Sequence, residues 1–198
     1  MVALRAYRPG DLDALYEICL RTGDSGQDAT SLHKHGQLIG HLYAAPYGVL
    51  EPSNVVVAED DEGVAGYVVG THDTDAFAAR LEREWWPALR ERYAQVPDVD
   101  LTPADRHRIA VIGAPHVTPA DIVAQYPAHI HMNLLPRLRG QRIGTSLLQI
   151  WVDQAREAGV AGIHLGANTA NTGGVAFWSR NFKPLRTEGR TVWFGMAL

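Results

Sequence analysis

The chain has 198 residues and a hydrophobic fraction of 46%, enough apolar side chain to bury the core of one domain, which we expect to span residues 1–198. Its 18 basic and 22 acidic residues give a formal net charge of -4, without the basic excess typical of nucleic-acid-binding proteins. No apolar run approaches the roughly 20 residues that span a bilayer, and the first residues lack the apolar stretch of a signal peptide. We therefore expect a cytoplasmic monomer or homodimer that binds neither nucleic acid nor a membrane.

The first quarter of the chain predicts a strand, a helix and a long irregular segment. Leu4 to Tyr7 has the composition of a short strand, and a Pro-Gly-Asp turn then leads into an amphipathic run. We expect Asp11 to cap this helix and Gly23 to end it. Asp24 to Pro52 is rich in Gly, Ser and His without clear periodicity, so it predicts a loop with one short helix around Leu32 to Leu42.

A hairpin and a long helix follow. Asn54 to Glu59 and Val64 to Thr71 are two β-rich runs joined by an Asp-Asp-Glu-Gly turn, which predicts an antiparallel pair. Apolar residues recur every four positions from Asp75 to Tyr93 and predict a helix that Pro87 kinks or divides.

Capping residues mark the starts of several helices. Asp73 or Thr74 fits the cap of the helix described above. The segment from Gln95 to Pro119 is the least regular part of the chain, but Thr102 and Thr118 each precede a proline at the first position of an expected helix.

The run from Ala128 to Leu135 alternates apolar and polar side chains, which predicts a strand. Its apolar face carries Ile130, Met132 and Leu134. Its polar face carries His129, His131 and Asn133. The strand therefore has one face able to do polar chemistry.

A strand, helix and strand in this region predict a parallel crossover. The amphipathic run Ile143 to Ala158 ends at Gly159, and Gly162 to Ala167 supplies the second strand. The remaining elements expected are a helix, Ala170 to Asn181, and an antiparallel pair, Pro184–Thr187 with Thr191–Leu198. This order predicts an α/β fold with a mixed sheet.

The turn Arg139 to Thr145 joins the strand ending at Leu135 to the amphipathic helix. A glycine-containing turn at the start of a helix exposes backbone N–H groups at the positive end of the helix dipole. Such a turn is suited to a phosphate or pyrophosphate, and its place between a strand and a helix strengthens the hypothesis. The sequence therefore predicts a phosphorylated cofactor at this turn.

The chain resembles the GCN5-related N-acetyltransferases (GNAT) over nearly its whole length. In that family a strand leads into an Arg/Gln-x-x-Gly-x-Gly/Ala turn and a helix, and a second strand leads to an Asn and an aromatic pair. The turn falls on Arg139 to Gly144, and the later signature on Asn171 and Phe177-Trp178. Three further segments are similar to the acetyltransferase-like domain of eukaryotic O-GlcNAcase and its bacterial relatives: Tyr7–Asp11, Ile18–Asp24 and Leu134–Arg137.

The resemblance implies a GNAT fold, mostly antiparallel with one splayed parallel strand pair, and acetyl-CoA as cosubstrate. It implies direct transfer of acetyl to an amine, aided by a base and an acid. The two parallel strands are expected to splay beyond Leu134, leaving backbone groups for the pantetheine amides. The cofactor-binding residues it implies are Leu134, Leu135, Arg139, Gly140, Gln141, Arg142, Ile143, Gly144, Thr145, Asn171 and Trp178.

Three positions depart from the family pattern. Arg142 replaces the first glycine of the turn, which removes conformational freedom but adds a cation. Trp178 stands where many members place a tyrosine that protonates the thiolate, although a register shifted by one would place Phe177 there. Asn133 lies where the O-GlcNAcase branch carries an acid, and an amide is not a base at neutral pH.

The catalytic residues proposed from the sequence are therefore His131, Asn133 and Trp178. A histidine on the polar face of a strand can act as a base, although such residues more often make structural hydrogen bonds. After the hairpin, His72, Asp73 and Asp75 could reach the acceptor or simply begin a helix. We expect no metal, because no group of ligating residues has compact spacing, and we expect Cys19 to be a buried structural thiol.

These observations lead to an acetyl-CoA-dependent N-acetyltransferase that acts on an unidentified amine of a small molecule or a protein. The alternative is an acetyl-CoA-binding module with little or no transferase activity. Asn133 and Trp178 motivate this alternative, because they occupy positions where acid and base groups would be expected.

Overall fold

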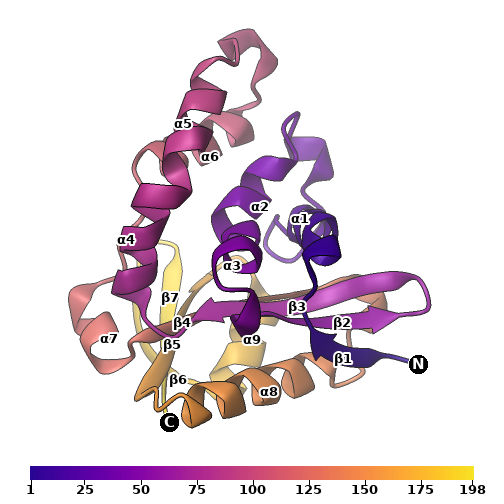
Figure 1. The fold of residues 1–198 in the computed structure, drawn as a ribbon, viewed down its shortest axis with the longest axis vertical. Coiled ribbons are helices and arrows are strands. Elements are labelled where there is room, and N and C mark those ends of the chain that lie inside the picture. Colours follow the sequence, from indigo (N-terminus) through magenta and orange to yellow (C-terminus); the bar gives the residue numbers. More distant parts are fainter.

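Seven strands form one mixed sheet in the computed structural model, which covers residues 1–198 (Figure 1). The strand order is β1-β2-β3-β4-β5-β7-β6, and only β4 and β5 are parallel neighbours. The strands are β1 (Ala3–Ala6), β2 (Val56–Asp60), β3 (Gly63–Thr71), β4 (Ala128–Leu134), β5 (Gly162–Asn168), β6 (Lys183–Glu188) and β7 (Thr191–Ala197). The α/β fold with a mixed, mostly antiparallel sheet is confirmed.

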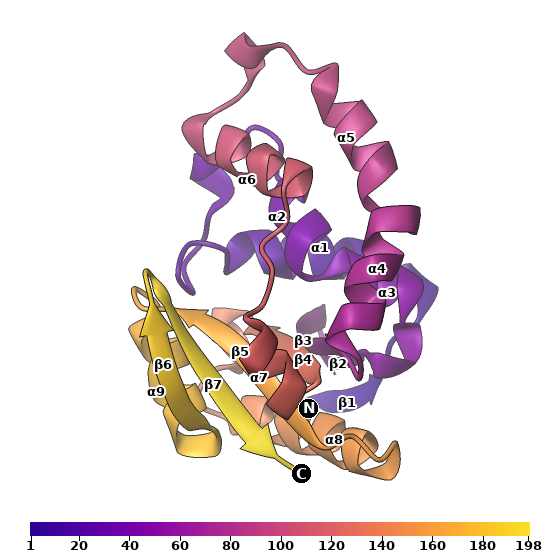
Figure 2. The same ribbon diagram turned by 90° about the vertical axis from the view of Figure 1, so that its left-hand side faces the viewer.

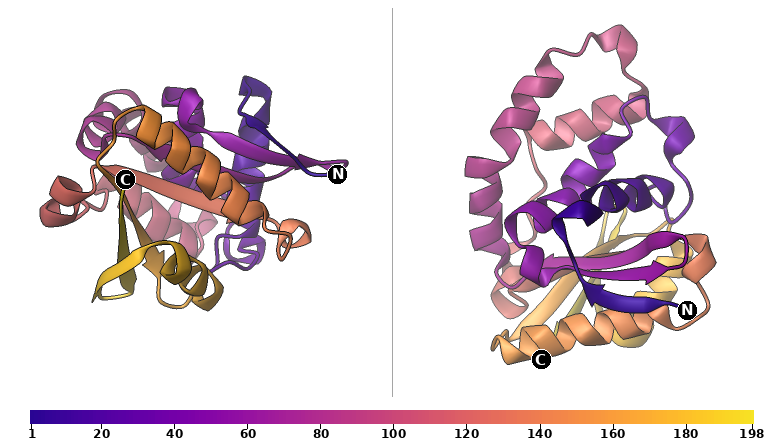
Figure 3. Two further views of the ribbon diagram at one scale, coloured as in Figure 1. Left: turned by 90° about the horizontal axis from the view of Figure 1, so that it is seen from below. Right: turned by 45° about the vertical axis from the view of Figure 1, so that its right-hand side comes forward.

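Helices cover both faces of this sheet. The N-terminal helices lie over one face, and α8 crosses the opposite face, as the view from below shows (Figure 3). The helices are α1 (Leu12–Arg21), α2 (Gln37–Tyr43), α3 (Ala45–Leu50), α4 (Thr74–Glu84), α5 (Trp86–Ala94), α6 (Pro103–Gly113), α7 (Ala120–Gln125), α8 (Ile143–Glu157) and α9 (Thr172–Asn181). None of them combines the length and apolarity that a membrane crossing needs.

Helix α8 is held on the sheet by the apolar stripe that the sequence predicts. Leu147 and Trp151 are fully buried, and the indole Nε1 of Trp151 donates a hydrogen bond to the backbone carbonyl of Asn54 at 2.9 Å. Burying each such large side chain stabilises the fold by about 1.5–3 kcal/mol. Gly159 ends the helix in the left-handed region with φ of 73°, as expected for a glycine cap.

The parallel strands β4 and β5 separate early. Their register contains only the pairs Ala128 with Ile163 and His129 with His164, so the backbone of β4 beyond His129 has no strand partner on the β5 side. The sequence placed the separation beyond Leu134, and the structure corrects this to His129. The gap between these two strands is therefore several residues deeper than expected.

Helices α4, α5 and α6 form an arm that projects beyond the sheet (Figure 2). The arm packs on α2 through a second apolar cluster, made of Leu38, Trp86, Leu89, Tyr93 and Ile112. A buried hydrogen bond also joins it to the segment before α2, because Nδ1 of His33 lies 2.8 Å from Oδ1 of Asp105. Burial raises the pKa of Asp105, but hydrogen bonds from the backbone N–H of Thr102, from His33 and from the backbone N–H of Lys34 outweigh it and lower the pKa to about 2.

Two of the predicted helix caps are confirmed and two are wrong. Asp73 accepts from the N–H of Ala76 at the start of α4, and Thr102 forms a capping box with α6. The carboxylate of Asp11 instead binds the guanidinium of Arg5 and the N–H of Arg8, so it does not cap α1. Thr118 is not the cap of α7, because Pro119 is the N-cap residue, the helix begins at Ala120, and no side chain caps it.

The segment from Asp24 to Pro52 contains more helix than its sequence predicts. The expected short helix lies later, at α2, and α3 follows it after a single residue. Leu38 and Ile39 of α2 are buried beneath the arm and against α1, so the tertiary contacts supply a stability that local periodicity does not show. Pro46 lies in the first turn of α3, where proline is well tolerated. The predicted break in the Asp75–Tyr93 helix is confirmed, with α4 and α5 meeting at Trp85.

Candidate functional site

The Arg139–Thr145 turn leaves the sheet between a short 3-10 turn and α8. Gly140 and Arg142 both adopt left-handed backbone conformations, with φ of 76° and 62°. Glycine reaches this region without strain, whereas an L side chain such as that of Arg142 is disfavoured there by about 1–2 kcal/mol. The backbone at Arg142 therefore keeps a shape suited to glycine although the residue is arginine.

The backbone N–H groups of Gly140 through Thr145 have no acceptor within the protein. The nearest helical hydrogen bond of the turn is the N–H of Ser146 to the carbonyl of Arg142, at 3.1 Å. Before the turn, the N–H of Arg139 already binds the carbonyl of Pro136. A run of unsatisfied donors at the N-terminus of a 15-residue helix is an electropositive cradle for an anion.

The side chains of this turn divide into two kinds. Arg139 is engaged, because Nε donates to the carbonyl of Leu134 at 3.2 Å and Nη2 to the carbonyl of Gly26 at 2.7 Å. Gln141 donates from its amide to the carbonyl of Arg137 at 2.7 Å and thereby fixes the turn. Arg142 is exposed and makes no side-chain hydrogen bond or ion pair. Its guanidinium is therefore the cation of the turn that is available to a ligand.

The other residues implied for cofactor binding lie around this turn. Leu135 is buried and donates its N–H to the carbonyl of Ala65, whereas Leu134 and Gly144 lie against each other, since a Cβ on Gly144 would come within 3.3 Å of the Leu134 side chain. Asn171 caps α9 by accepting the N–H of Gly174 at 2.9 Å. Its amide also faces Gly26, the residue bound by Arg139, so the loop after α1 reaches both the turn and the start of α9.

The aromatic pair of α9 points in two directions. Trp178 is only 8% exposed and packs edge-to-face between Phe177 and Phe182, with ring centroids 4.9 and 5.5 Å away. Phe177 lies beside Gly144 at the start of α8, where a Cβ on that glycine would come 3.6 Å from the Phe177 ring. Phe177 is thus the aromatic residue next to the turn, and Trp178 belongs to the core.

His131 faces the helical side of β4 and has no hydrogen-bond partner. Its ring lies 5.6 Å from the ring of Tyr43, 5.7 Å from that of Tyr47 and 5.9 Å from that of His129. Burial, together with the neighbouring His164, lowers the pKa of His131 to about 4. The imidazole is therefore neutral at physiological pH, with a ring nitrogen able to accept a proton.

His129 is held by a chain of hydrogen bonds. The hydroxyl of Thr74 lies 2.7 Å from the carbonyl of Pro127 and must donate to it, so Nδ1–H of His129 donates to Thr74 at 2.8 Å. Nε2 of His129 then accepts the hydroxyl proton of Tyr47 at 2.7 Å. Both ring nitrogens are used, so His129 orients Tyr47 and has no nitrogen left for a substrate.

Asn133 also makes two side-chain contacts. Its Nδ2 donates to the hydroxyl of Thr22, which in turn donates to the carbonyl of Ile18 at 2.7 Å. Its Oδ1 accepts the hydroxyl of Tyr67 at 3.2 Å. This amide joins α1 to β3 and β4, an arrangement that orients the strand.

The helical layer leaves β5 uncovered beyond the point where the strands separate. His164 pairs with His129 and is buried, with Nδ1 2.6 Å from the carbonyl of Tyr126. Gly166 and Asn168 follow on the same face of β5 by strand alternation, and both are exposed. An acceptor can therefore approach the gap between β4 and β5 over this part of β5.

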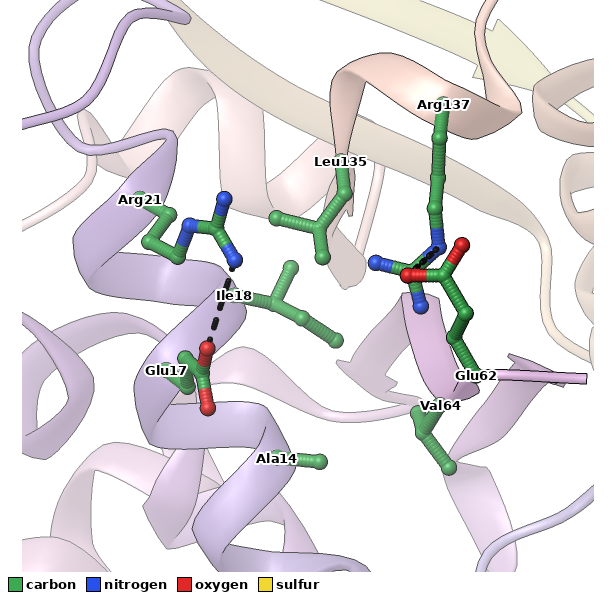
Figure 4. Close-up of a pocket in the computed structure, with 8 residues that line it drawn as sticks. All are labelled: Ala14, Glu17, Ile18, Arg21, Glu62, Val64, Leu135 and Arg137. Carbon is green, nitrogen blue, oxygen red and sulfur yellow. Dashed lines mark hydrogen bonds and ion pairs between the residues drawn. The ribbon is translucent and has the colours of Figure 1, made fainter. Parts of the chain in front are cut away.

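A cavity of about 230 Å³ lies between α1, the β2–β3 turn and the residues after β4 (Figure 4). Its centre is apolar, and its rim carries two ion pairs, Arg21 with Glu17 and Arg137 with Glu62. Arg137 also binds Asp60 at 2.7 Å. Because every charged group on the rim is paired, this cavity offers no base and no unpaired charge.

Comparison with known proteins agrees with this geometry. The family model described as Acetyltransferase (GNAT) family matches residues 20–182, and the chain belongs to this family. It is 24% identical over 160 residues to the proteins named Protein O-GlcNAcase of Rattus norvegicus and Mus musculus. The match covers 80% of this chain but only 17% of those longer proteins. The predicted relationship to the acetyltransferase-like domain of O-GlcNAcase is thus confirmed.

Solved structures of similar proteins also agree with this fold. The crystal structure of SsHAT is 35% identical with a TM-score of 0.90, covering 99% of this chain and 98% of that chain. PaiA N-acetyltransferase from Thermoplasma acidophilum, solved in complex with coenzyme A, is 14% identical with a TM-score of 0.61 and covers nearly all of both chains. At that identity the second match supports the fold alone.

The sequence missed the residues that surround His131. Tyr43 and Tyr47 lie on α2 and α3, in a segment whose sequence showed no clear pattern. His72, which the sequence offered as a residue that could reach the acceptor, packs against Trp151 with ring centroids 5.4 Å apart. Only the tertiary structure brings Tyr43 and Tyr47 to the polar face of β4, and no local signal marks them.

Proposed function

We propose that this protein transfers the acetyl group of acetyl-CoA to an amine. The observation that carries the proposal is the run of backbone donors from Gly140 to Thr145 at the N-terminus of α8, beside strands that separate at His129. The residues fit the cosubstrate, because a pyrophosphate needs several donors and a nearby cation, and Arg142 is available. The coenzyme A complex of the Thermoplasma acidophilum relative supports this choice.

Unpaired backbone groups of β4 and β5 would hold the amides of the pantetheine arm, as a further strand would do. Bound in this way, acetyl-CoA supplies an activated thioester carbonyl. An amine that approaches over Gly166 and Asn168 would reach this carbonyl from the helical face of the sheet. Holding both reactants in place removes most of the entropic cost of the reaction.

His131 is the base in this proposal. Its neutral ring lies on the helical face, two residues beyond the last parallel pair, and has no protein partner. It takes one proton from the attacking nitrogen while the new C–N bond forms and the C–S bond breaks. Asn133 orients β4, and Phe177 lies beside the turn but has no proton to give, so coenzyme A leaves as the thiolate and is protonated by solvent.

Calorimetric titration with acetyl-CoA tests the first step. We expect micromolar binding that weakens strongly when a phosphate-free analogue replaces the cosubstrate. Release of coenzyme A in the presence of an amine panel tests the second step. Absence of acetyl-CoA binding would overturn the proposal, and binding without any acetyl transfer would instead define a binding module.

A further inference from the structure

Arg108 is the one half-buried arginine of this chain that has no carboxylate partner. The other half-buried arginines are paired with Asp or Glu, and the remaining unpaired arginines are exposed. Removing a guanidinium from water is costly unless an anion compensates it. A cation kept in this position is therefore well suited to an anion that the protein itself does not supply.

The contacts of Arg108 place it on the helical side of β4. Nη1 lies 3.3 Å from the hydroxyl of Tyr43, and the guanidinium carbon lies 5.7 Å from the centre of the same ring. The ring of His131 is another neighbour of Tyr43, with 5.6 Å between the ring centroids. The charge also acts on the buried thiol of Cys19, opposing the rise in its pKa that burial causes.

Nearby acids are already committed to other partners. Asp105, one turn earlier on α6, is bound by His33 and by backbone N–H groups at its helix cap. Glu51 accepts from the amide of Asn54 and the hydroxyl of Thr71. The cation beside Tyr43 therefore has no carboxylate of this chain as a partner.

We propose that the acceptor amine carries a carboxylate and that Arg108, backed by Tyr43, recognises it. This inference rests on the proposed function and adds the substrate class. Arginine binds a carboxylate through two parallel N–H donors, and the aromatic ring beneath it fixes the plane of the guanidinium. A carboxylate held there keeps the amine of the same molecule beside Tyr43, whose ring lies 5.6 Å from that of His131.

Matched pairs of amines test the substrate class. Glycine, 4-aminobutyrate, L-aspartate and L-phenylalanine would each be compared with the carboxamide of the same compound, by release of coenzyme A. We expect kcat/KM for at least one acid to exceed that of its amide by roughly 10- to 100-fold, the range of a charged hydrogen-bonded pair. Carboxamides have the less basic amine, so reactivity alone would favour them and cannot mimic this result. Equal or faster reaction of all the amides would overturn the inference.

Substitution of the arginine links the preference to this residue. Arg108→Met should remove the preference for acids, chiefly by raising their KM. It should change kcat/KM for each carboxamide by less than about threefold and leave the affinity for acetyl-CoA unchanged. Arg108→Lys should restore part of the preference for acids. Arg106→Met is the matched control, because that guanidinium pairs with Asp98 at the surface of the same helix. An equal loss for acids and amides in Arg108→Met would indicate a purely structural role and overturn the inference.

A binding measurement separates this inference from the proposed function. N-acetylglycine, N-acetyl-L-phenylalanine and their carboxamides would be titrated into protein saturated with coenzyme A, which requires no catalysis. Tighter binding of an acid supports the role of Arg108, and no difference contradicts it. Failure of acetyl-CoA itself to bind would overturn the proposed function instead.

Discussion

The two halves of the candidate site are built in different ways. The Arg139–Thr145 turn consists of consecutive residues, and its donors are backbone groups that are aligned by the start of α8. The polar face of β4 contacts Thr22 after α1 and side chains of α2, α3 and β3. In the proposed function, a local motif would bind the cosubstrate, while long-range packing would shape the part that meets the acceptor.

The turn and the polar face of β4 also differ in their exposure to water. The turn is exposed, and its charge contributions are screened by solvent and salt. The histidines of β4 are shielded, so the protein controls their protonation. Five predictions follow from this contrast, in order of expected size.

The largest effect should come from the base. His131→Gln is expected to lower kcat by roughly 100-fold or more, since an amide cannot accept a proton, with acetyl-CoA affinity unchanged. Single-turnover acetyl transfer and calorimetry would measure the two quantities. His107→Gln, an exposed histidine on α6, is the control and should have no effect. A rate within threefold of the parent protein would remove His131 from the mechanism.

The shielded histidines should make the protein unstable in acid. Burial lowers the pKa of His41 and of His131 to about 4, whereas an unfolded histidine titrates near 6.5. Between those values the unfolded chain binds protons that the folded chain does not, so the free energy of unfolding falls as pH decreases. At pH 5 each of these residues should cost about 2 kcal/mol relative to pH 7.5.

Urea denaturation at several pH values would measure this loss. His131→Phe should reduce the slope between pH 6.5 and pH 4 by about one proton. An unfolding free energy that stays constant over this range would mean that the histidines are solvated in the folded state.

The arm should depend on its buried carboxylate. Asp105→Asn is expected to destabilise the protein by about 2 kcal/mol, because the folded pKa of about 2 lies well below the usual 3.8. The same shift predicts that this contribution is present above pH 4 and is lost as pH falls through 2. Thermal unfolding would detect the change, and Asp98→Asn, an exposed acid of the same arm, should have little effect.

Removing charge from the exposed Arg139–Thr145 turn should have a smaller effect than the substitution of His131 on the shielded face of β4. Replacement of Arg139 and Arg142 together by Gln is expected to weaken acetyl-CoA binding roughly 10-fold, with greater sensitivity to salt in the parent protein. Arg180→Gln with Arg190→Gln provides a control at two other exposed, unpaired arginines. Unchanged affinity in the first pair would place the pyrophosphate elsewhere.

The smallest effect concerns backbone shape. Arg142→Gly should raise the free energy of unfolding by up to about 1 kcal/mol, because glycine accepts the left-handed conformation without strain. The same change should weaken acetyl-CoA binding by removing the available cation. We therefore expect Arg142→Gly to raise stability and to lower acetyl-CoA affinity. A loss of stability would show that the Arg142 side chain has a structural contact.

The sequence predicted those features that depend on neighbours along the chain. The strand, turn and helix around Arg139 follow from alternation, turn composition and an apolar stripe, and the structure contains all three. The parallel crossover and the C-terminal antiparallel pair agree as well. Each of these depends on contacts between residues close in sequence or on a motif shared by a large family.

Other features could not be predicted because they depend on tertiary contacts. The hydroxyl of Tyr47 reaches His129 across 82 positions, and Asn133 reaches Thr22 across 111. Asp11 was taken for a helix cap, yet Arg5 binds it more strongly as an ion pair. The early separation of β4 from β5 could not be predicted, because the residue sequence of a strand does not show where its hydrogen bonds to a neighbouring strand end.

This separation has a mechanical consequence. Two residue pairs between β4 and β5 join strands β1–β4 to strands β5–β7, so the sheet consists of two half-sheets with a short connection. A ligand that forms hydrogen bonds with both β4 and β5 would strengthen this connection. Saturating acetyl-CoA should therefore slow amide hydrogen exchange in both half-sheets, well beyond the residues that it touches.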